Sequence, residues 1–195
     1  MLDIGGGSLE IAAGSDEAPD IAISLPLGAG RLTREAFAGA GVGKASSGEV
    51  AKARLRVRQS VARLAPEMAR GGPADMAVAT SKTFRSLARV CAGEEGPATV
   101  LQRADLRDWV PRLARMDGSA RSMLPGVSLT RAPQLLAGAI VAEALLDLLD
   151  LDSVAICPWA LREGVILDHF DSLPDPGDLV SVGGPLPALS QHQRP

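Results

Sequence analysis

Apolar and polar residues alternate over the first part of the chain and then take up helical spacing. Residues 8–13 alternate and follow a glycine triplet, which predicts a β-hairpin, and residues 21–27 are predicted to form a third strand. Residues 31–38 suit a short helix. From Ser47 to about Arg70, apolar positions recur at intervals of three or four residues, so the pattern predicts one long amphipathic helix.

Strands and helices alternate in the rest of the chain. Residues 74–80 form a nearly continuous apolar run, which is typical of a buried strand, and a helix is expected over 84–91. An amphipathic segment follows at 103–115, where Pro111 predicts a break or a new first turn. Residues 118–130 are rich in loop-forming types, so no regular element is predicted there.

The most apolar helix of the chain is predicted to begin at Pro133 and to extend to about Leu149. It can form either the core of the domain or the contact surface of a dimer. A last buried strand is predicted over 154–157 and a helix over 161–170. Over 172–195, proline and glycine recur without periodicity, and we expect a mobile tail. Three strands followed by alternating helices and strands indicate an α/β fold with a mixed sheet.

The composition limits the kinds of function open to the chain. Its 195 residues suit one domain, and 46% hydrophobic with 22% charged residues excludes a wholly disordered chain. A net charge of −3 and 3% aromatic residues argue against nucleic-acid binding, and no apolar run is long enough to span a membrane. Cys91 and Cys157 have no metal-ligand spacing, so we expect a reduced, cytoplasmic protein.

The most specific chemistry lies in the stretch Asp3-Ile4-Gly5-Gly6-Gly7-Ser8-Leu9-Glu10. Successive glycine N–H groups can line a concavity for a phosphate oxygen, and Ser8 adds a hydroxyl donor. Asp3 ends the first strand and Glu10 lies on the returning strand, so a tight hairpin brings both carboxylates beside the turn. A divalent cation between the carboxylates and a phosphate accounts for this pairing. The alternative is a glycine hairpin with two solvated acids.

This stretch resembles the second phosphate loop of the exopolyphosphatase/guanosine pentaphosphate phosphatase (Ppx/GppA) family of the actin-like ATPase superfamily. Family members carry D-x-G-G-G-S-x-E and then S-L-P-L-G-A-x-R-L-T, which this chain has as residues 3–10 and 24–33. The later landmarks R-x-P and L-R-E-G match residues 131–133 and 161–164, with Gly138 between them. The resemblance implies an actin-like (ribonuclease H-like) lobe, a mixed sheet with an N-terminal β-hairpin and flanking helices.

The chain departs from the family where most members have a glycine-glycine-threonine turn. Residues 80–85 are T-S-K-T-F-R, closest to actinobacterial members, with Ser81 and Lys82 in place of the glycines. These larger side chains close space near the backbone and add a positive charge, which favours a polyanion over an adenosine nucleotide. The phosphate-binding candidates are therefore Ser81, Lys82, Thr83 and, after a second glycine cluster, Arg31. Solvated or helix-capping roles are the alternatives.

The resemblance covers only the second lobe of the two-lobed family core, as residues 1–171. The family's first lobe bears a D-x-G-S-N phosphate loop and the glutamate thought to activate the attacking water, and this sequence shows neither. Only Met1 and Leu2 precede Asp3, whereas a strand in a sheet normally has about five to six residues. We therefore expect that Met1 is not the natural start and that a first lobe is encoded upstream.

The resemblance implies hydrolysis of a terminal phosphoanhydride bond, in inorganic polyphosphate or in guanosine penta- or tetraphosphate. It implies Mg²⁺ as cofactor, with Asp3 and Glu10 as the catalytic, metal-holding carboxylates. A non-catalytic polyphosphate- or alarmone-binding module is the first alternative, because the first lobe is missing, and a sugar or acetate kinase-like lobe is the second. The expected partners are polyphosphate or the alarmone and a second copy in a homodimer, without nucleic acid or membrane.

Overall fold

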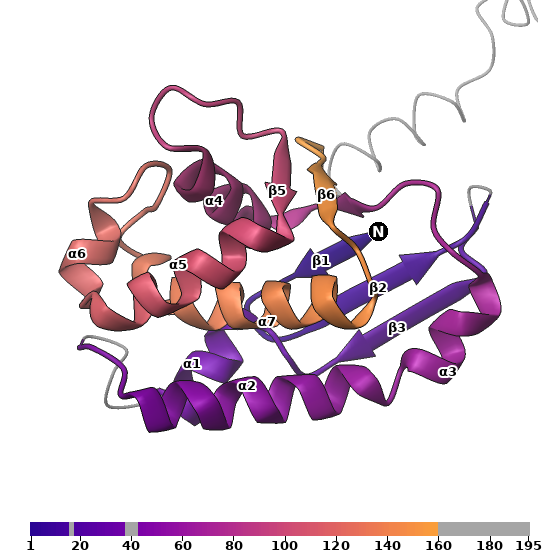
Figure 1. The fold of residues 1–195 in the computed structure, drawn as a ribbon, viewed down its shortest axis with the longest axis horizontal. Coiled ribbons are helices and arrows are strands. Elements are labelled where there is room, and N and C mark those ends of the chain that lie inside the picture. Colours follow the sequence, from indigo (N-terminus) through magenta and orange to yellow (C-terminus); the bar gives the residue numbers. More distant parts are fainter. Residues whose placement is uncertain (16–17, 38–42, 160–195) are drawn as a thin grey trace, which may run out of the picture. The chain divides into compact units, whose positions relative to one another are not determined.

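A six-stranded mixed sheet with helices packed against it makes up the residues that the structure, a computed structural model, describes: 1–15, 18–37 and 43–159 (Figure 1). In chain order the strands are β1 (Leu2–Ile4), β2 (Leu9–Ala13), β3 (Ile21–Leu25), β4 (Val78–Ala79), β5 (Val100–Gln102) and β6 (Ser153–Ile156). In space their order is β3-β2-β1-β4-β6-β5, with β1, β4 and β6 parallel and the other pairs antiparallel. This arrangement confirms the α/β fold with a mixed sheet.

The helices are α1 (Ala29–Ala36), α2 (Ser47–Ala62), α3 (Ala65–Met68), α4 (Ser81–Ala92), α5 (Arg103–Arg115), α6 (Gly118–Ser122) and α7 (Leu135–Leu148), with short 3₁₀ helices at Ala69–Gly71 and Ala132–Gln134. Among the described residues, no helix has the length and apolarity needed to cross a membrane. The predicted helix over 161–170 and tail over 172–195 lie outside the described residues.

The first two strands form the predicted hairpin, with Asp3 paired to Glu10 and Ile4 paired to Leu9. Because side chains alternate across a sheet, Leu2, Ile4, Leu9 and Ile11 face the core and are at most 3% exposed. Asp3 and Glu10 point to the opposite face and are half-buried. The hairpin therefore separates its apolar side chains from the two carboxylates.

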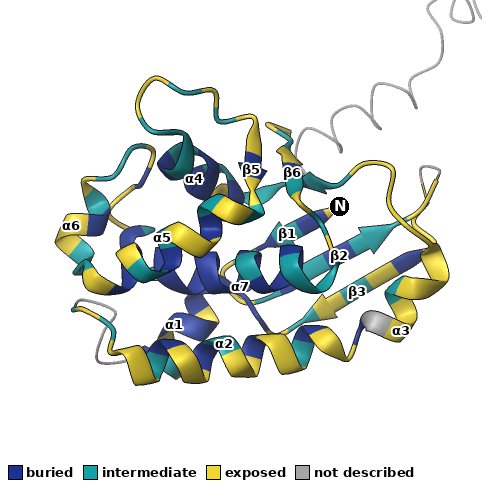
Figure 2. Cartoon of the chain, viewed as in Figure 1, coloured by how far each residue is buried: buried dark blue, intermediate teal, exposed yellow. Residues whose placement is uncertain are grey.

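Helix α7 is the centre of the core. It contacts α1, α2, α4 and α5, and most of its residues are buried, as Figure 2 shows by dark blue turns next to teal ones. A helix that is apolar over most of its surface is normally enclosed by other elements. Of the two predicted roles for this segment, the structure therefore supports the core of the domain.

The predicted helix from Ser47 to Arg70 is divided in the structure. Ser46 caps α2 and exchanges hydrogen bonds with Glu49, which fixes the start close to the predicted one. Helix α2 then ends at Ala62, four residues before Pro66. Proline lacks an N–H and its ring clashes with the carbonyl four residues earlier, which disfavours continuation of α2, and a new helix, α3, begins at Ala65.

In α5 a proline does not end the helix, so the predicted break at Pro111 is wrong. The helix runs through Pro111 without interruption. Leu106, Val110 and Leu113 are fully buried, and α5 packs closely on α7. We attribute the continuous helix to this burial, which offsets the hydrogen bond that Pro111 removes.

Other predictions need smaller corrections. The buried strand expected over 74–80 is reduced to Val78–Ala79, because the preceding residues, including Met76, are exposed. The loop expected over 118–130 contains α6, which Asp117 caps and Arg121 anchors. Arg121 is 1% exposed and donates to the Leu113 carbonyl at 3.0 Å, and burial lowers its pKa. Strand β5 was not predicted from the sequence.

Candidate phosphate and metal site

The glycine turn between β1 and β2 is open at its tip. Gly6 and Gly7 are exposed, and a Cβ added to either would meet no atom within 4 Å. The N–H of Gly5 donates to the Ser8 carbonyl at 2.9 Å and closes the hairpin. In the described part of the chain, the N–H groups of Gly6, Gly7 and Ser8 have no protein acceptor. The hairpin therefore uses the predicted donor Gly5, whereas the other donors stay available to an anion.

Helix α1 supports this turn from behind. The N–H of Ala29 donates to the Gly5 carbonyl and the N–H of Arg31 donates to the Gly6 carbonyl, both at 2.9 Å. The first N–H groups of a helix lack partners within the helix, so the turn satisfies them. The start of α1 thus holds the carbonyls of the turn. The sequence did not predict this role for residues 28–30.

The glycines before and inside α1 allow that close approach. A Cβ on Gly28 would lie 2.4 Å from the backbone nitrogens of Gly7 and Ser8, and a Cβ on Gly30 would lie 2.9 Å from the Gly6 carbonyl oxygen. Real Cβ atoms do not come so close to backbone atoms. The turn at residues 5–7 can therefore pack against α1 in this way only because Gly28 and Gly30 have no side chain.

A row of polar side chains crosses the sheet next to the turn. Asp3 on β1 lies opposite Glu10 on β2, which in turn lies opposite Ser24 on β3. The Ser24 hydroxyl donates to Oε1 of Glu10 at 3.3 Å, and the Thr80 hydroxyl donates to Oδ2 of Asp3 at 2.6 Å. The order across the sheet is therefore hydroxyl, carboxylate, carboxylate, hydroxyl.

The two central carboxylates suit a divalent cation. Side chains directly opposite on antiparallel strands have Cβ atoms about 5 Å apart, and like charges there destabilise the pair. Within the described residues, neither Asp3 nor Glu10 forms an ion pair with Lys or Arg. Mg²⁺ is commonly bound through one or two carboxylates together with substrate phosphates. The described residues contain no group of three metal-ligating side chains, so this pair fits Mg²⁺ only with phosphate or water as further ligands.

Two of the predicted cations lie at the same edge of the sheet. Arg31 is exposed, and its backbone contacts the turn. Lys82 is exposed in the first turn of α4, which follows β4. Because β4 runs parallel to its neighbour β1, the start of α4 and the glycine turn both leave the carboxyl ends of their strands. Both residues can therefore attract a polyanion to this edge.

Thr83, in contrast, faces the core. It is 4% exposed, and its hydroxyl is buried without a hydrogen-bond partner. A Cβ on Gly138 of α7 would lie 2.5 Å from Cγ2 of Thr83, so the two helices touch here. The structure therefore does not bring the Thr83 hydroxyl to the glycine turn, because the third residue of α4 packs against α7.

Ser81 has a backbone conformation that explains the glycine found there in most of the family. Its φ is +77°, in the left-handed region that glycine adopts without strain. Its hydroxyl accepts a hydrogen bond from the N–H of Phe84 at 3.4 Å. The Ser81 side chain therefore serves the start of α4 in this arrangement.

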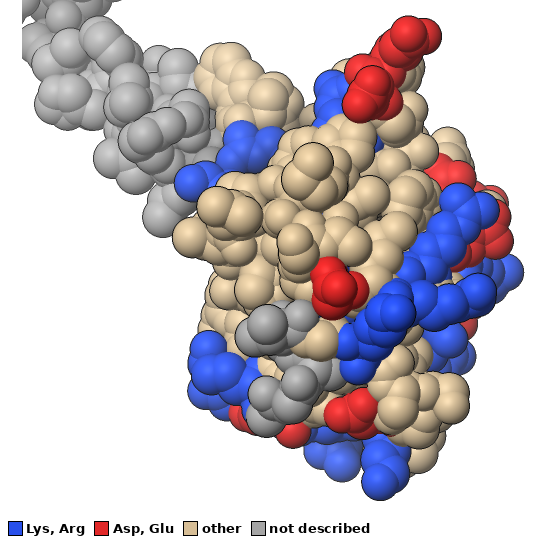
Figure 3. All heavy atoms as spheres, turned by 90° about the vertical axis from the view of Figure 1, so that its left-hand side faces the viewer, with Lys and Arg blue, Asp and Glu red and all other residues tan. Residues whose placement is uncertain are grey.

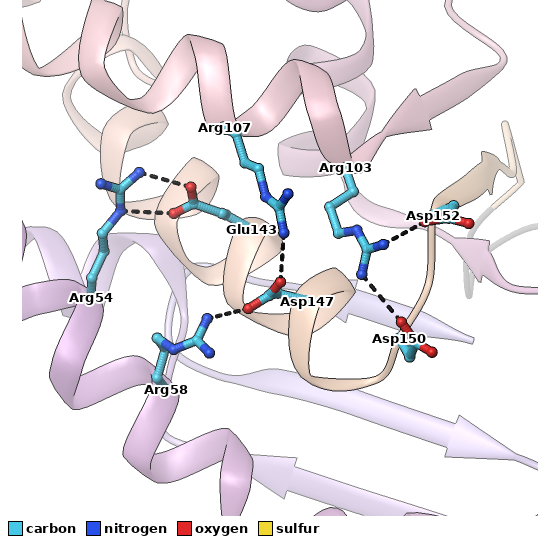
Figure 4. A network of polar contacts seen from close by, with 8 residues as sticks. All are labelled: Arg54, Arg58, Arg103, Arg107, Glu143, Asp147, Asp150 and Asp152. Atoms are coloured by element: carbon cyan, nitrogen blue, oxygen red, sulfur yellow. Dashed lines mark hydrogen bonds and ion pairs between the residues drawn. The ribbon is translucent and has the colours of Figure 1, made fainter.

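A second polar cluster, which the sequence analysis did not single out, joins α2, α5 and α7 (Figure 4). Arg54 donates twice to Glu143, and Arg58 and Arg107 both pair with Asp147. Hydrogen bonding from Arg58, above all, lowers the pKa of Asp147. Arg103 pairs with the two aspartates after α7.

This arginine–carboxylate network is balanced in charge. It lines a cavity of about 140 Å³, but each arginine there already has a carboxylate partner. On the face shown in Figure 3, Lys and Arg also form a band with Asp and Glu beside it. In the network, α2, α5 and α7 each contribute two charged side chains four residues apart, a spacing that the sequence shows. We assign the network to helix packing.

A family model described as the Ppx/GppA phosphatase family matches residues 1–173. The chain belongs to this family. The phosphate-loop motif and the glycine cluster that supports it both lie in the matched region, so the resemblance inferred from the sequence is confirmed.

Several curated relatives of this chain are named Exopolyphosphatase 1. Exopolyphosphatase 1 of Mycobacterium tuberculosis (strain H37Rv) is 48% identical over 179 residues, which cover 89% of this chain and 51% of that protein. Exopolyphosphatase 1 of Mycobacterium leprae is 46% identical over 186 residues, which cover 93% of this chain and 54% of that protein. The chain thus spans about half the length of these relatives.

Solved structures confirm the fold. A Ppx/GppA family member from Aquifex aeolicus has a TM-score of 0.73 at 24% identity, covering 87% of this chain and 55% of that one. An exopolyphosphatase from Cytophaga hutchinsonii has a TM-score of 0.72 at 20% identity, covering 89% and 57%. The chain therefore has the actin-like fold of Ppx/GppA proteins, as the sequence predicted.

Proposed function

We propose that this chain is the second actin-like lobe of an exopolyphosphatase, and that the whole protein releases terminal phosphate from inorganic polyphosphate. The observation that carries the proposal is the pairing of Asp3 with Glu10 beside an open glycine turn. The mycobacterial relatives that are 46–48% identical to this chain are named Exopolyphosphatase 1, which favours polyphosphate over guanosine pentaphosphate.

Each residue of the site has a separate task in this proposal. The N–H groups of Gly6, Gly7 and Ser8 bind phosphate oxygens, and the Ser8 hydroxyl adds a further donor. Asp3 and Glu10 hold Mg²⁺, which, when bound, neutralises charge on the phosphates. The exposed side chains of Arg31 and Lys82 raise the local concentration of a polyanion. These tasks are positioning and electrostatic stabilisation, on which phosphoryl transfer mainly depends.

The second candidate is a non-catalytic polyphosphate-binding module. This candidate is favoured because the chain matches only about half the length of the relatives. Groups that the relatives carry in their other half have no counterpart in the matched region.

Phosphate release and tripolyphosphate binding are measured with Mg²⁺ on the 195-residue chain alone and on the chain fused to the half of Exopolyphosphatase 1 that it does not match. We expect the chain alone to bind without release, because the loss of a general base typically costs 10²–10⁴-fold. Release by the fusion supports the exopolyphosphatase, and binding without release by the fusion supports the module.

The proposed site is tested by neutralising its carboxylates. Asp3→Asn and Glu10→Gln keep the side-chain volume, so each should weaken Mg²⁺-dependent tripolyphosphate binding at least tenfold with little change in melting temperature. Ser8→Ala should do less harm, because the backbone donors remain. Asp75→Asn makes the same chemical change at an exposed position away from the row and is the matched control. Binding that survives both carboxylate changes would remove Asp3 and Glu10 from the site.

A further inference from the structure

Thr80 contacts β1 through both its backbone and its side chain. Its N–H donates to the Leu2 carbonyl at 2.9 Å, and its hydroxyl donates to Oδ2 of Asp3 at 2.6 Å. These contacts hold consecutive residues of β1, so the hydroxyl and the carboxylate have little freedom to move apart. Thr80 is half-buried, which limits competition from water.

The Thr80 hydroxyl does not cap helix α4, although its position would allow it. Thr80 immediately precedes α4, where threonine commonly caps a helix by accepting a backbone N–H. Its side chain makes no capping hydrogen bond, and Ser81 accepts from the N–H of Phe84 instead. The hydroxyl of Thr80 therefore donates to Asp3 and does not take part in the helix cap.

This contact has a direct consequence for a ligand carboxylate. A hydroxyl has one hydrogen to donate, and here that hydrogen goes to Oδ2. Within the described residues Asp3 accepts no other side-chain hydrogen bond, so Oδ1 and the remaining lone pairs can bind a cation. Hydrogen bonds from a neighbouring side chain fix the orientation of a carboxylate ligand and thereby raise its affinity for the metal.

We infer that Thr80 is a positioning residue that holds the Asp3 carboxylate ready for the divalent cation. The inference rests on the proposed role of Asp3 in binding that cation. Ser24 bears the same relation to Glu10, but its hydroxyl lies 3.3 Å from the carboxylate and the residue is exposed. The contribution of Ser24 is correspondingly smaller.

Binding of Mn²⁺ to the 195-residue chain, followed by electron paramagnetic resonance, tests this role without any turnover. Thr80→Val keeps the shape and removes the donor, so it should weaken Mn²⁺ binding about 10–100-fold. Thr80→Ser keeps the hydroxyl and should restore most of the affinity. Ser24→Ala should weaken binding less than Thr80→Val. Thr83→Val is the matched control, since its lost hydroxyl lies in the core without a partner.

The outcomes separate this inference from the proposed function. Mn²⁺ binding that is lost in Asp3→Asn but unchanged in Thr80→Val overturns the positioning role alone. Binding that is absent in the wild type, or equal in the wild type and Asp3→Asn, overturns the metal site and the inference together. A Thr80→Val variant that melts earlier but binds Mn²⁺ normally marks Thr80 as merely structural, and Thr80→Ser then brings no gain in affinity.

Discussion

Replacing Gly28 with alanine tests whether the glycine turn depends on close contact with the start of α1. Gly28 is buried, and its φ of −65° and ψ of 149° are values that alanine adopts freely. The backbone of alanine therefore fits, and most of the penalty is steric. The new Cβ would lie 2.4 Å from backbone atoms of Gly7 and Ser8, which cannot rotate away as a side chain can.

The size of the effect follows from this geometry. Inserting a methyl group into packed surroundings costs about 1–3 kcal/mol. Alanine is also a poorer residue than glycine at the position before a helix, which adds about 0.5–1 kcal/mol. The free energy of unfolding should therefore fall by about 1.5–4 kcal/mol, which lowers the melting temperature by roughly 3–16 °C for a chain of this size.

Thermal melts and tripolyphosphate titration measure the two consequences of Gly28→Ala. Any relief of the clash must displace Gly7 and Ser8, so Mg²⁺-dependent binding should weaken even where part of the stability is regained. Gly48→Ala is the matched control, because a Cβ there meets nothing within 4 Å; its stability should stay unchanged or rise by up to about 1 kcal/mol. A Gly28→Ala variant that melts and binds like the wild type would refute the packing argument.

Two further predictions concern stability alone. Ser81→Gly should raise the free energy of unfolding by about 0.5 kcal/mol in denaturant titrations, because relief of the positive φ outweighs both the added freedom of the unfolded chain and the loss of the long hydrogen bond from the Phe84 N–H. The wild type should be more stable than Asp147→Asn at neutral pH. Because the folded pKa of Asp147 lies below 3.8, that difference should be complete above this pH and disappear as the pH falls through the lowered pKa, as melts across the acid range would show.

The sequence predicted those parts of the fold that one local pattern determines. The hairpin, the central helix α7 and the last strand were predicted within a few residues, because each has its own apolar periodicity. The outcomes at Pro66 and Pro111 could not be told apart from sequence. The pattern predicted a helix that runs through Pro66 and a break at Pro111, whereas α2 ends before Pro66 and α5 continues through Pro111. Only the burial of Leu106, Val110 and Leu113 against α7 shows why α5 continues.

The candidate site was predicted in its composition but not in its contacts. The motif placed Asp3, Glu10 and the glycine turn together, as the structure shows. The hydroxyls of Thr80 and Ser24 come from strands or strand ends that are distant in sequence, and only sheet register reveals their carboxylate partners. Burial of Thr83 likewise depends on the small size of Gly138 on another helix.

The most direct test of the central claim is whether a cation held by Asp3 and Glu10 lies next to a bound phosphate. With Mn²⁺ in place of Mg²⁺, the ³¹P relaxation rates of added tripolyphosphate report on that proximity. The account predicts strong enhancement of ³¹P relaxation with the wild-type chain and none beyond free Mn²⁺ with the Asp3→Asn/Glu10→Gln double variant. Equal enhancement with both proteins would contradict it.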